Sequence, residues 1–489
     1  MWLDVRNLNT KVTRATDEEV AWLRHYLAFD DATAYHRGRA GEKIHLFHLV
    51  EQTFPTGFLP LIQKAAKEAG VTIEVGDNRE PVCNPKASKD SHLDWLREYQ
   101  LDAVLAVVAR KRGIVKAPTG AGKTEIATGL ASMLWCRWLF LVHRGNLLEQ
   151  AAERFEKRLN EKAGRIGDGQ WDVQRFTVAT FQTLYAALER ERKRKKARIV
   201  RVERGDGLTH VTEAVWPTPA GDLLRATEGL IVDECHTLPA GSFYKVAMSC
   251  PAYYRVGLSG TPLARTDQRS ILAVGALGPV IYSIRPELLI KEGVLSKPRI
   301  RLVRVQQEAS WWTERDWQKV YRECVVESPL RNGTLADLAK RAAKPCLVFV
   351  KEIDHGKLLH RKLREVGLKA EFVWGSDTTK ERQRAISRLV SGHTEVLISS
   401  VIFQEGVDIP QLRSVVVGSG GKSIIAALQR IGRGMRVSEG KTSFEVYDIR
   451  DEGNPWLEKH GRARIKAYVS EGHEVLDLQQ MPLGFTLEG

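Results

Sequence analysis

The sequence predicts an α/β protein with two consecutive parallel-sheet domains. Between residues 95 and 297, apolar runs typical of buried strands alternate with helical patterns. A second series of the same kind follows residue 298. Such alternation favours βαβ units and a parallel sheet that is covered on both faces. Two domains of about 150–200 residues each also fit the usual size of a domain.

The expected strands locate the domains along the chain. In the first domain they read GIVKA, WLFLV, FTVATF, GLIVDE and YRVGLSG, and we place this domain at 91–297. In the second they read PCLVFV, AEFVW, EVLISS, SVVVGS and FEVYDI, and we place it at 298–452. Residues 1–90 form a small α/β module whose helix FLPLIQKAAKEAG ends at Gly70. Residues 453–489 carry the pattern WLEKHGRARIKAYV, which predicts a short helical tail.

The charge balance indicates a polyanionic partner. The chain carries a formal charge of +14 and has a pI near 9.4, which favours nucleic acid but also fits a basic protein without such a partner. An insertion at 185–228 contains the run ERERKRKKARIVRVER. This run is either a solvated charged loop or an arm that contacts phosphates. The candidates for phosphate contact are Lys193, Arg194, Lys195 and Lys196.

Other features exclude whole classes of protein. No apolar stretch of about 18 residues is present, and the first residues lack a signal-peptide pattern, so no membrane partner is expected. The six cysteines are far apart and form no C-x-x-C pair, which argues for a reducing cytosol and against a disulfide framework. We therefore expect a cytoplasmic protein.

The stretch GIVKAPTGAGKTE at 113–125 predicts a phosphate-binding loop between a strand and a helix. It matches the P-loop pattern except that Ala117 replaces the first glycine. Gly120 and Gly122 allow the backbone to turn its N–H groups toward phosphate oxygens, and the helix N-terminus adds positive charge. We expect Lys123 to reach the phosphates and the Thr124 hydroxyl to bind Mg²⁺. The loop residues assigned to the nucleotide are Pro118, Thr119, Gly120, Ala121, Gly122, Lys123, Thr124 and Glu125.

The stretch LIVDECHT at 230–237 raises three alternatives: a metal site, a thiol nucleophile with its base, and the acidic partner of the phosphate loop. A P-loop NTPase needs an acidic residue at the end of another strand, and Asp233 follows LIV in that position. Asp233 is then an Mg²⁺ ligand, and Glu234 orients or deprotonates the attacking water. Cys235 is a small packing residue, and His236 links the site to neighbouring motifs. A zinc site would need further ligands at short spacing, which the sequence lacks here.

The order of motifs resembles that of superfamily 2 helicases. LREYQ resembles the Q motif, whose Gln100 reads adenine in that family. LVHRGNLLEQ and TVATFQTL resemble the motifs that grip the nucleic-acid backbone, and LSGTP resembles the motif that couples hydrolysis to domain movement. The resemblance implies that the backbone contacts are His143, Arg144, Thr180 and Gln182. It implies that the coupling residues are His236, Ser259 and Thr261.

The second domain continues the resemblance. LVFVKEIDHG resembles motif IV and supplies Lys351, VLISSVIFQEGVDIP resembles motif V, and QRIGRGMR resembles motif VI. The family's fold is two tandem RecA-like domains that close on ATP. The implied ribose-sensing residues are Glu405, Gly406 and Asp408, and the implied γ-phosphate residues are Gln429, Arg433 and Arg436. Arg433 and Arg436 lie on one face of a helix and stabilise transferring phosphate only if the domains close.

Within the superfamily, the combination of DECH, QEGVDIP and QRIGRGMR is most similar to double-strand DNA translocases of the XPB, RadD and UvsW type. Residues 17–75 also resemble the N-terminal domain of the UvsW type. This resemblance implies ATP and Mg²⁺ as cofactors and remodelling of branched DNA by Holliday-junction migration, fork regression or unwinding of D-loops and R-loops. The expected partners are duplex, forked or four-way DNA, RNA–DNA hybrids, and recombination or replication proteins, with a monomer as the expected state.

Three other functions stay open on the sequence. They are an RNA helicase for structured RNA, a motor subunit of a restriction system, and a non-catalytic ATP-gated clamp. The stretch SWWTERDW is also open between two interpretations. Trp311, Trp312 and Trp317 form either a stacking platform for an unpaired base or a packing cluster between helices.

Overall fold

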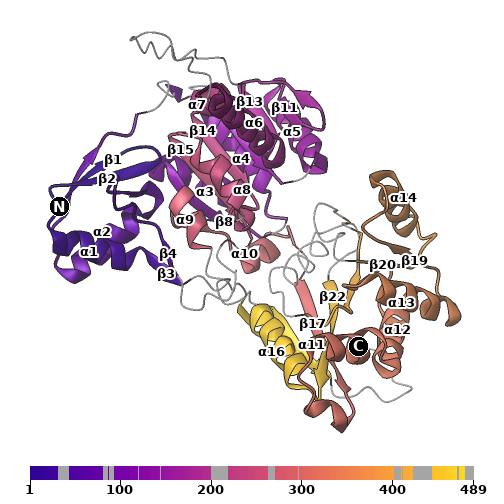
Figure 1. The fold of residues 1–489 in the computed structure, drawn as a ribbon. Coiled ribbons are helices and arrows are strands. Elements are labelled where there is room, and N and C mark those ends of the chain that lie inside the picture. The colour runs from indigo at the N-terminus through magenta and orange to yellow at the C-terminus, as the bar shows by residue number, and fades with distance from the viewer. Residues whose placement is uncertain are drawn as a thin grey trace. The chain divides into compact units, whose positions relative to one another are not determined.

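The computed structural model divides into two compact units, each with its own sheet and core (Figure 1). Unit 1 comprises Met1–Ala117 and Gly122–Ile284, and unit 2 comprises Pro118–Ala121 and Arg285–Gly489. The structure describes residues 1–30, 43–80, 86–87, 93–118, 120–143, 145–199, 219–239, 241–260, 262, 270–295, 297–400, 409, 411–421, 443–470 and 473–478.

Unit 1 begins with a small sheet of order β5-β2-β1-β6. Side chains alternate between the core and solvent along β1 and β2, so that Leu3, Val5 and Val12 are buried. The helix predicted to end at Gly70 does so, because Gly70 takes the left-handed conformation with φ +71°. The elements are β1 (Trp2–Val5), β2 (Asn9–Thr13), α1 (Asp17–Tyr26), β3 (Ala28–Asp30), β4 (Lys43–His45), β5 (Thr53–Pro55), α2 (Leu59–Ala69) and β6 (Glu74–Asp77).

The small sheet is packed onto the rest of unit 1. A Cβ added at Gly57, in the turn before α2, would collide with the carbonyl oxygen of Val274 in the helix α9 (Ile271–Leu277). The Asn7 side chain donates to the Pro251 carbonyl, 2.9 Å away, and the buried Arg112 donates to the Asn7 carbonyl, 2.5 Å away. These contacts anchor the N-terminal module to the larger sheet of the same unit.

The large sheet of unit 1 has the order β12-β11-β13-β10-β14-β15-β8-β16. Its neighbouring strands are parallel except for the β11–β12 pair. The apolar runs GIVKA, WLFLV, FTVATF, GLIVDE and YRVGLSG supply β8, β10, β13, β14 and β15, as predicted. The strands are β8 (Arg112–Lys116), β10 (Trp138–Val142), β11 (Gly164–Gly167), β12 (Gln170–Trp171), β13 (Phe176–Thr180), β14 (Gly229–Asp233), β15 (Tyr254–Ser259) and β16 (Val280–Ser283). A separate antiparallel pair joins β7 (Lys86–Ala87) to β9 (Leu134–Trp135).

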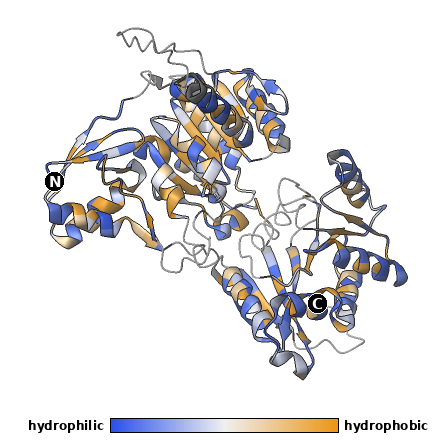
Figure 2. Cartoon of the chain, in the orientation of Figure 1, coloured by the Kyte–Doolittle hydropathy of each residue, from blue (hydrophilic) through white to orange (hydrophobic). Residues whose placement is uncertain are grey.

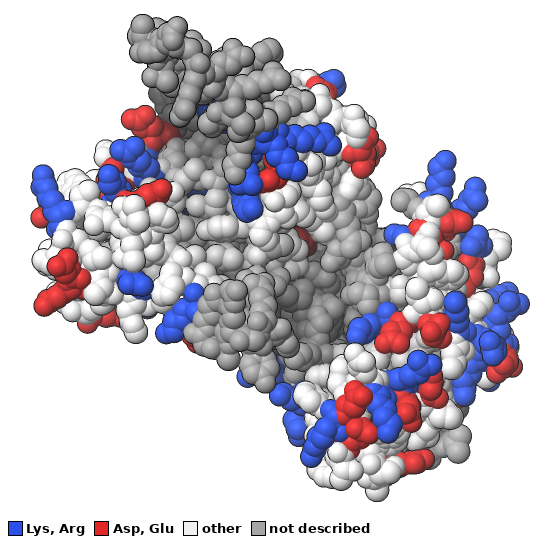
Figure 3. Space-filling model, in the orientation of Figure 1, with Lys and Arg blue, Asp and Glu red and all other residues white. Residues whose placement is uncertain are grey.

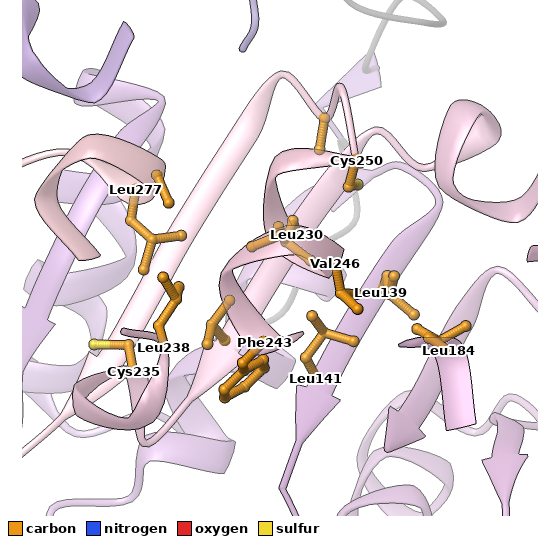
Figure 4. Close-up of a cluster of buried hydrophobic side chains, with 14 of the residues drawn as sticks. Leu139, Leu141, Leu184, Leu230, Cys235, Leu238, Phe243, Val246, Cys250 and Leu277 are labelled. Atoms are coloured by element: carbon orange, nitrogen blue, oxygen red, sulfur yellow. The ribbon is translucent and has the colours of Figure 1, made fainter. Parts of the chain in front are cut away.

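Helices cover this sheet and bury its apolar strands (Figure 2). One core cluster joins Leu139, Leu141, Leu230 and Val232 to Phe243 of α8, and part of it is drawn in Figure 4. The helices are α3 (Glu98–Arg110), α4 (Lys123–Met133), α5 (Gly145–Leu159), α6 (Phe181–Ile199), α7 (Pro219–Ala226), α8 (Gly241–Met248) and α9 (Ile271–Leu277).

The basic insertion begins as a helix. The sequence left residues 185–228 open between a solvated charged loop and an arm that contacts phosphates. In the structure, α6 continues through Ile199 and α7 begins at Pro219. Part of the insertion is therefore ordered on unit 1. Two backbone N–H groups at the start of α7 donate to the Glu191 carboxylate of α6, at 3.0 and 3.3 Å.

Unit 2 contains a parallel sheet of order β19-β20-β18-β21-β22-β17-β23. The strands are β17 (Lys297–Gln306), β18 (Cys346–Phe349), β19 (Ala370–Val373), β20 (Val396–Ser399), β21 (Ser414–Val417), β22 (Ser443–Glu452) and β23 (Glu474–Leu478). Its helices are α10 (Pro286–Lys291), α11 (Trp317–Val320), α12 (Pro329–Arg341), α13 (Ile353–Glu365), α14 (Thr379–Val390) and α16 (Pro455–Ser470). The architecture of two parallel-sheet α/β domains is the predicted one.

The C-terminal segment is more than a helical tail. Its predicted helix is α16, but β23 then adds to the sheet beside β17, with Arg299 opposite Glu474. Ion pairs between Asp477 and the arginines Arg304 and Arg450, at 2.9 and 2.6 Å, fasten this edge strand. In the described part of the chain, no helix is long and apolar enough to cross a membrane.

Candidate functional site

The candidate site lies where three neighbouring parallel strands of unit 1 end. The sheet order places β14, β15 and β8 side by side, so that Asp233, Ser259 and Lys116 lie along one edge. The backbone N–H of Ala117 donates to the Ser259 carbonyl, 2.9 Å away, and carries this pairing into the phosphate loop. Ligands of open parallel sheets bind outside such carboxyl ends.

The loop between β8 and α4 has the backbone that its glycines predict. Gly120 and Gly122 have φ values of +91° and +81°, which residues with a Cβ rarely adopt. Gly122 is the N-cap of α4, so that Lys123 and Thr124 occupy its first turn. The N-terminus of a helix carries unpaired N–H groups and partial positive charge, and both attract phosphate.

Lys123 pairs with the second carboxylate of the DECH stretch. Its Nζ atom lies 2.5 Å from Oε1 of Glu234, a residue 111 positions further along the chain. Burial alone would lower the pKa of Lys123, but the Glu234 and Asp233 carboxylates outweigh burial and raise it. Burial would likewise raise the pKa of Glu234, but Lys123 and His236 hold it well below its ordinary value. Both side chains are therefore charged at neutral pH.

His236 joins the two strand ends. Its Nδ1 atom lies 3.2 Å from Oε2 of Glu234 and 3.1 Å from Oγ of Ser259. His236 and Ser259 are both buried, at 7% and 0% exposure. A continuous polar chain therefore runs from Lys123 through Glu234 and His236 to Ser259.

Asp233 is the acidic residue whose surroundings fit a cation. Its Oδ1 atom is buried and has no hydrogen-bond partner among the described residues. Burial, together with the neighbouring Glu234 charge, raises the pKa of Asp233. A divalent cation at Oδ1 would supply the missing positive partner, and Mg²⁺ prefers such oxygen ligands. The donor set at this edge therefore fits the metal of a nucleotide complex.

Cys235 has the surroundings of a packing residue. It is fully buried in the core cluster with Leu238 and Phe243, and Figure 4 shows it among these side chains. Burial raises the pKa of its thiol far above the ordinary value, so the reactive thiolate does not form near neutral pH. In the described part of the chain, no three His, Cys, Asp or Glu side chains are arranged to hold a metal. The packing interpretation of Cys235 is the one that its contacts favour.

Gln100 and Glu125 flank the phosphate loop with different contacts. Gln100 is buried in α3, and its Nε2 atom lies 2.3 Å from the position that a Cβ on Gly122 would take. Its Oε1 atom accepts from the backbone N–H of Arg97, 3.0 Å away. Glu125 instead faces α5, where its carboxylate pairs with Arg158 at 3.0 Å.

The described candidates for nucleic-acid contact in unit 1 also lie at strand ends. His143 follows β10 and Thr180 ends β13, and these strands are parallel neighbours. The Gln182 side chain donates to the His143 carbonyl, 2.7 Å away, and Thr180 shares a hydrogen bond of 2.8 Å with Thr183. These segments are thus brought together, whereas Lys193 is exposed on α6.

In unit 2, Lys351 follows β18, and its ammonium lies 4.8 Å from the centre of the Tyr321 ring. Several predicted residues lie outside the described part of the chain. They are Thr119, Arg144, Thr261, Glu405, Gly406, Asp408, Gln429, Arg433 and Arg436. Arg194, Lys195 and Lys196 belong to α6, but their side chains are also outside the description.

Two buried arginines, which no sequence pattern marks, fix the loop after β21. Arg331 of α12 pairs with Asp451 at 2.9 Å and donates to the Gly418 carbonyl at 2.8 Å. Arg464 of α16 pairs with Asp448 at 2.8 Å and donates to the Gly421 carbonyl, also at 2.8 Å. Both side chains looked like ordinary helical surface charges in the sequence, because nothing local marks them as buried.

Replacing Arg464 with Met is expected to destabilise unit 2. The change leaves Asp448 buried without its cation, which costs about 3–5 kcal/mol of unfolding free energy. Thermal unfolding followed by circular dichroism measures the loss. Arg462→Met on the same helix is the control, because the Arg462 side chain is 72% exposed and its loss should change stability by no more than about 0.5 kcal/mol. Equal melting temperatures for the two variants would contradict the expectation.

Family models match both units. The model described as "Type III restriction enzyme, res subunit" matches residues 94–264, and "Helicase conserved C-terminal domain" matches 331–438. The chain is 27% identical over 378 residues to DNA 3'-5' translocase XPB2 of Sulfurisphaera tokodaii, covering 70% of this chain and 78% of that protein. It is 25% identical over 397 residues to ATP-dependent DNA helicase uvsW of Enterobacteria phage T4, covering 76% and 75%.

The first relatives matched include longer proteins, of which the chain spans slightly less than two thirds, 64% and 63% of their length. Among solved structures, the fold is similar to the ATP-dependent Type ISP restriction-modification enzyme LlaBIII bound to DNA. The TM-score is 0.56 at 14% identity, over 86% of this chain and 34% of that one. The two matched models describe helicase-type domains. The two RecA-like units and the phosphate loop beside the Asp–Glu–Cys–His stretch point to the same class. The chain belongs to the superfamily 2 helicases.

Proposed function

We propose that the chain is an ATP-dependent DNA helicase or translocase that remodels branched DNA. The observation that carries the proposal is the polar chain from Lys123 through Glu234 and His236 to Ser259. It connects the proposed phosphate-binding lysine to the end of a neighbouring strand. A change at the nucleotide therefore has a direct route into the segment that carries Ser259 and Thr261.

ATP and Mg²⁺ are the proposed cofactors. The backbone N–H groups of the loop and the Lys123 ammonium would hold the phosphates. The Thr124 hydroxyl and the Asp233 carboxylate would hold Mg²⁺, whose charge neutralises phosphate oxygens during transfer. Glu234 would orient the attacking water once phosphate replaces it as the partner of Lys123. Gln100 is the proposed adenine-reading residue, and its amide already faces Gly122.

The second unit contributes the remaining proposed groups. Gln429, Arg433 and Arg436 are assigned to the γ-phosphate, and Glu405, Gly406 and Asp408 to the ribose. Arginines supplied from a second domain stabilise the negative charge of phosphoryl transfer. Because they act only when the domains close, ATP turnover would be tied to domain movement. His143, Arg144, Thr180, Gln182 and Lys351 are the proposed backbone contacts during that movement.

DNA is the substrate that the relatives favour. The relatives described above are named a DNA translocase and a DNA helicase, and the charge of +14 suits a polyanion. The branch-migration roles rest on the resemblance to the UvsW type. We further propose that the protein acts in the cytoplasm as a monomer, with recombination or replication proteins as partners.

An ATPase and unwinding screen at fixed salt tests the substrate. The panel contains single strands, blunt duplex, forks, four-way junctions, RNA–DNA hybrids and structured RNA. Forked or four-way DNA should stimulate turnover most and should be rearranged in an ATP-dependent manner. Strongest stimulation by structured RNA would instead establish an RNA helicase.

The first matched model is described as a restriction-enzyme subunit, so the motor subunit of a restriction system is a second candidate function. A motor of that kind would work with a nuclease and a methylation-sensitive recognition function. The same ATPase and unwinding screen separates the two candidates. Strongest stimulation by blunt duplex without rearrangement of forks or four-way junctions would favour a restriction motor, whereas junction remodelling would favour the first proposal.

Neutralising Lys193, Arg194, Lys195 and Lys196 to Gln tests the α6 run. If these residues contact phosphates, their loss should reduce the slope of log affinity against log salt by up to about 4 contacts. Figure 3 shows Lys and Arg side chains gathered near α6. Duplex-DNA affinity measured by fluorescence anisotropy from low to high salt gives the slope. An unchanged slope would leave the run as a solvated helix.

A further inference from the structure

The three tryptophans of the SWWTERDW stretch have different surroundings in the structure. Trp317 belongs to a packing cluster, with its ring centre 4.6 Å from that of His460 and 5.4 Å from that of Tyr321. Trp311 packs against the same cluster, partly buried. Trp312 differs from both, because it is 51% exposed and lines a cavity of about 680 Å³.

The cavity lies beyond the carboxyl ends of β17 and β22. These parallel neighbours end at Gln306 and Glu452, and both of these residues line the cavity. The other wall is α16, through Gly461, Arg462 and Ile465. The carboxyl ends of parallel strands are where open α/β sheets bind ligands. The cavity therefore lies at a favourable edge and belongs to unit 2 alone.

The indole is presented by a braced turn. The buried Asn454 donates from Nδ2 to the Trp311 carbonyl, 2.7 Å away, and accepts at Oδ1 from the Trp456 N–H at 2.9 Å. The Gln307 N–H donates to the Glu452 carbonyl, 2.8 Å away, and holds the two strand ends together. A turn whose backbone is held in this way loses little conformational entropy when a flat partner stacks on its side chain.

The charges around the cavity cancel in pairs. Arg450 lies 3.1 Å from Glu452 and also pairs with Asp477 of β23, and Arg462 lies 3.6 Å from Glu458. The fifth charge, Asp451, is buried and paired with Arg331. Figure 3 shows acidic and basic side chains interspersed over unit 2 in the same way. A lining of balanced donors and acceptors suits a neutral, flat, polar ligand better than a phosphate or a cation.

A row of aromatic rings connects this cavity to a proposed nucleic-acid contact. Lys351 lies over Tyr321, Tyr321 contacts Trp317, and Trp311 packs on the same cluster immediately before Trp312. The Tyr321 hydroxyl also donates to the Ser419 carbonyl beyond β21, 2.9 Å away. Because β18, β21, β22 and β17 are consecutive neighbours, the row follows one edge of the sheet.

We propose that this cavity, defined by Trp312, Gln306, Arg450, Glu452, Glu458 and Gly461, binds an unpaired DNA base that stacks on Trp312. The neutral edge of the base meets the paired arginines and glutamates, and its backbone stays outside. The inference rests on the proposed function, because it assumes that DNA follows the edge marked by Lys351. It adds a contact to a base, in addition to those to the backbone, that would hold a strand separated at a fork.

Variants that remove the stacking surface and a variant that fills the cavity test the proposal. Trp312→Ala removes the platform, while Trp312→Phe keeps a ring. Gly461→Leu fills the space from α16, because a Cβ at Gly461 would meet no atom within 4 Å. Trp171→Ala in unit 1 is the control, since Trp171 is also exposed, at 40%. Melting temperatures establish that each variant is folded.

The readout is anisotropy binding to three DNAs of equal length: a fork with normal unpaired arms, the same fork with abasic arms, and blunt duplex. Trp312→Ala and Gly461→Leu should each weaken binding to the normal fork about tenfold, the order expected for one lost base–aromatic stack. Binding to the abasic fork and the duplex should stay within about twofold, with Trp312→Phe and the control near wild type.

Equal losses on the normal and abasic forks, or wild-type binding by Trp312→Ala, would overturn the base-binding cavity. Either result is distinguishable from failure of the proposed function. If the proposed function itself fails, the wild-type chain will show no binding to any of the three DNAs and no stimulation of its ATPase by them.

Discussion

Lys123→Ala is expected to remove ATP turnover almost completely. The ammonium is the group of the P-loop that reaches the outer phosphates, and loss of one such stabilising donor typically costs about 10²–10³-fold in rate. The structure adds a second reason. Glu234 and Asp233 would lose the cation that offsets their charge, so that anionic phosphate would meet uncompensated carboxylates. DNA-stimulated phosphate release, followed with a coupled assay, measures the effect.

The control for this experiment is Lys157→Ala, which removes an exposed lysine from α5 in the same unit. It should hydrolyse ATP at the wild-type rate. Lys123→Ala should remain folded, as judged from its melting curve, and should lose nucleotide affinity as well as turnover. Near-normal hydrolysis by a pure sample of Lys123→Ala would refute the assignment of the nucleotide site.

Glu234→Gln is expected to separate binding from hydrolysis. The amide has the shape of the carboxylate but cannot accept a proton, and loss of a positioned base costs at least about 10²-fold in turnover. Lys123 and His236 keep the pKa of Glu234 low, so the wild-type residue is an anion able to orient water. Since the phosphate loop is untouched, the variant should still bind ATP. Turnover and fluorescent-nucleotide affinity are measured on one preparation.

A second consequence follows for DNA binding. A variant that binds ATP without hydrolysing it should accumulate in the ATP-bound state, and its DNA affinity with ATP should differ from that without nucleotide. Glu153→Gln, at an exposed position of α5, is the matched control and should behave as wild type. If Glu234→Gln turns ATP over at the wild-type rate, another group handles the water and our proposal for Glu234 is wrong.

The sequence was sufficient for the elements whose signal is local. A buried parallel strand is a short apolar run, and such runs located β8, β10, β14 and β15 because both faces of each strand are covered. The phosphate loop was equally clear, since its glycines, lysine and threonine are consecutive. The strand β23 was missed because it is an edge strand with an exposed Leu476, and its pairing with β17 supplies what its composition does not.

The sequence by itself determined the two-domain α/β plan, the phosphate loop and the acidic residue that ends β14. These depend on apolar periodicity and on backbone freedom within a few residues. Only the tertiary structure decided that Glu234 pairs with Lys123, that His236 reaches Ser259, and that Arg331 and Arg464 are buried beside carboxylates. Such contacts join residues brought together by the order of strands in a sheet, and no short stretch of sequence records that order.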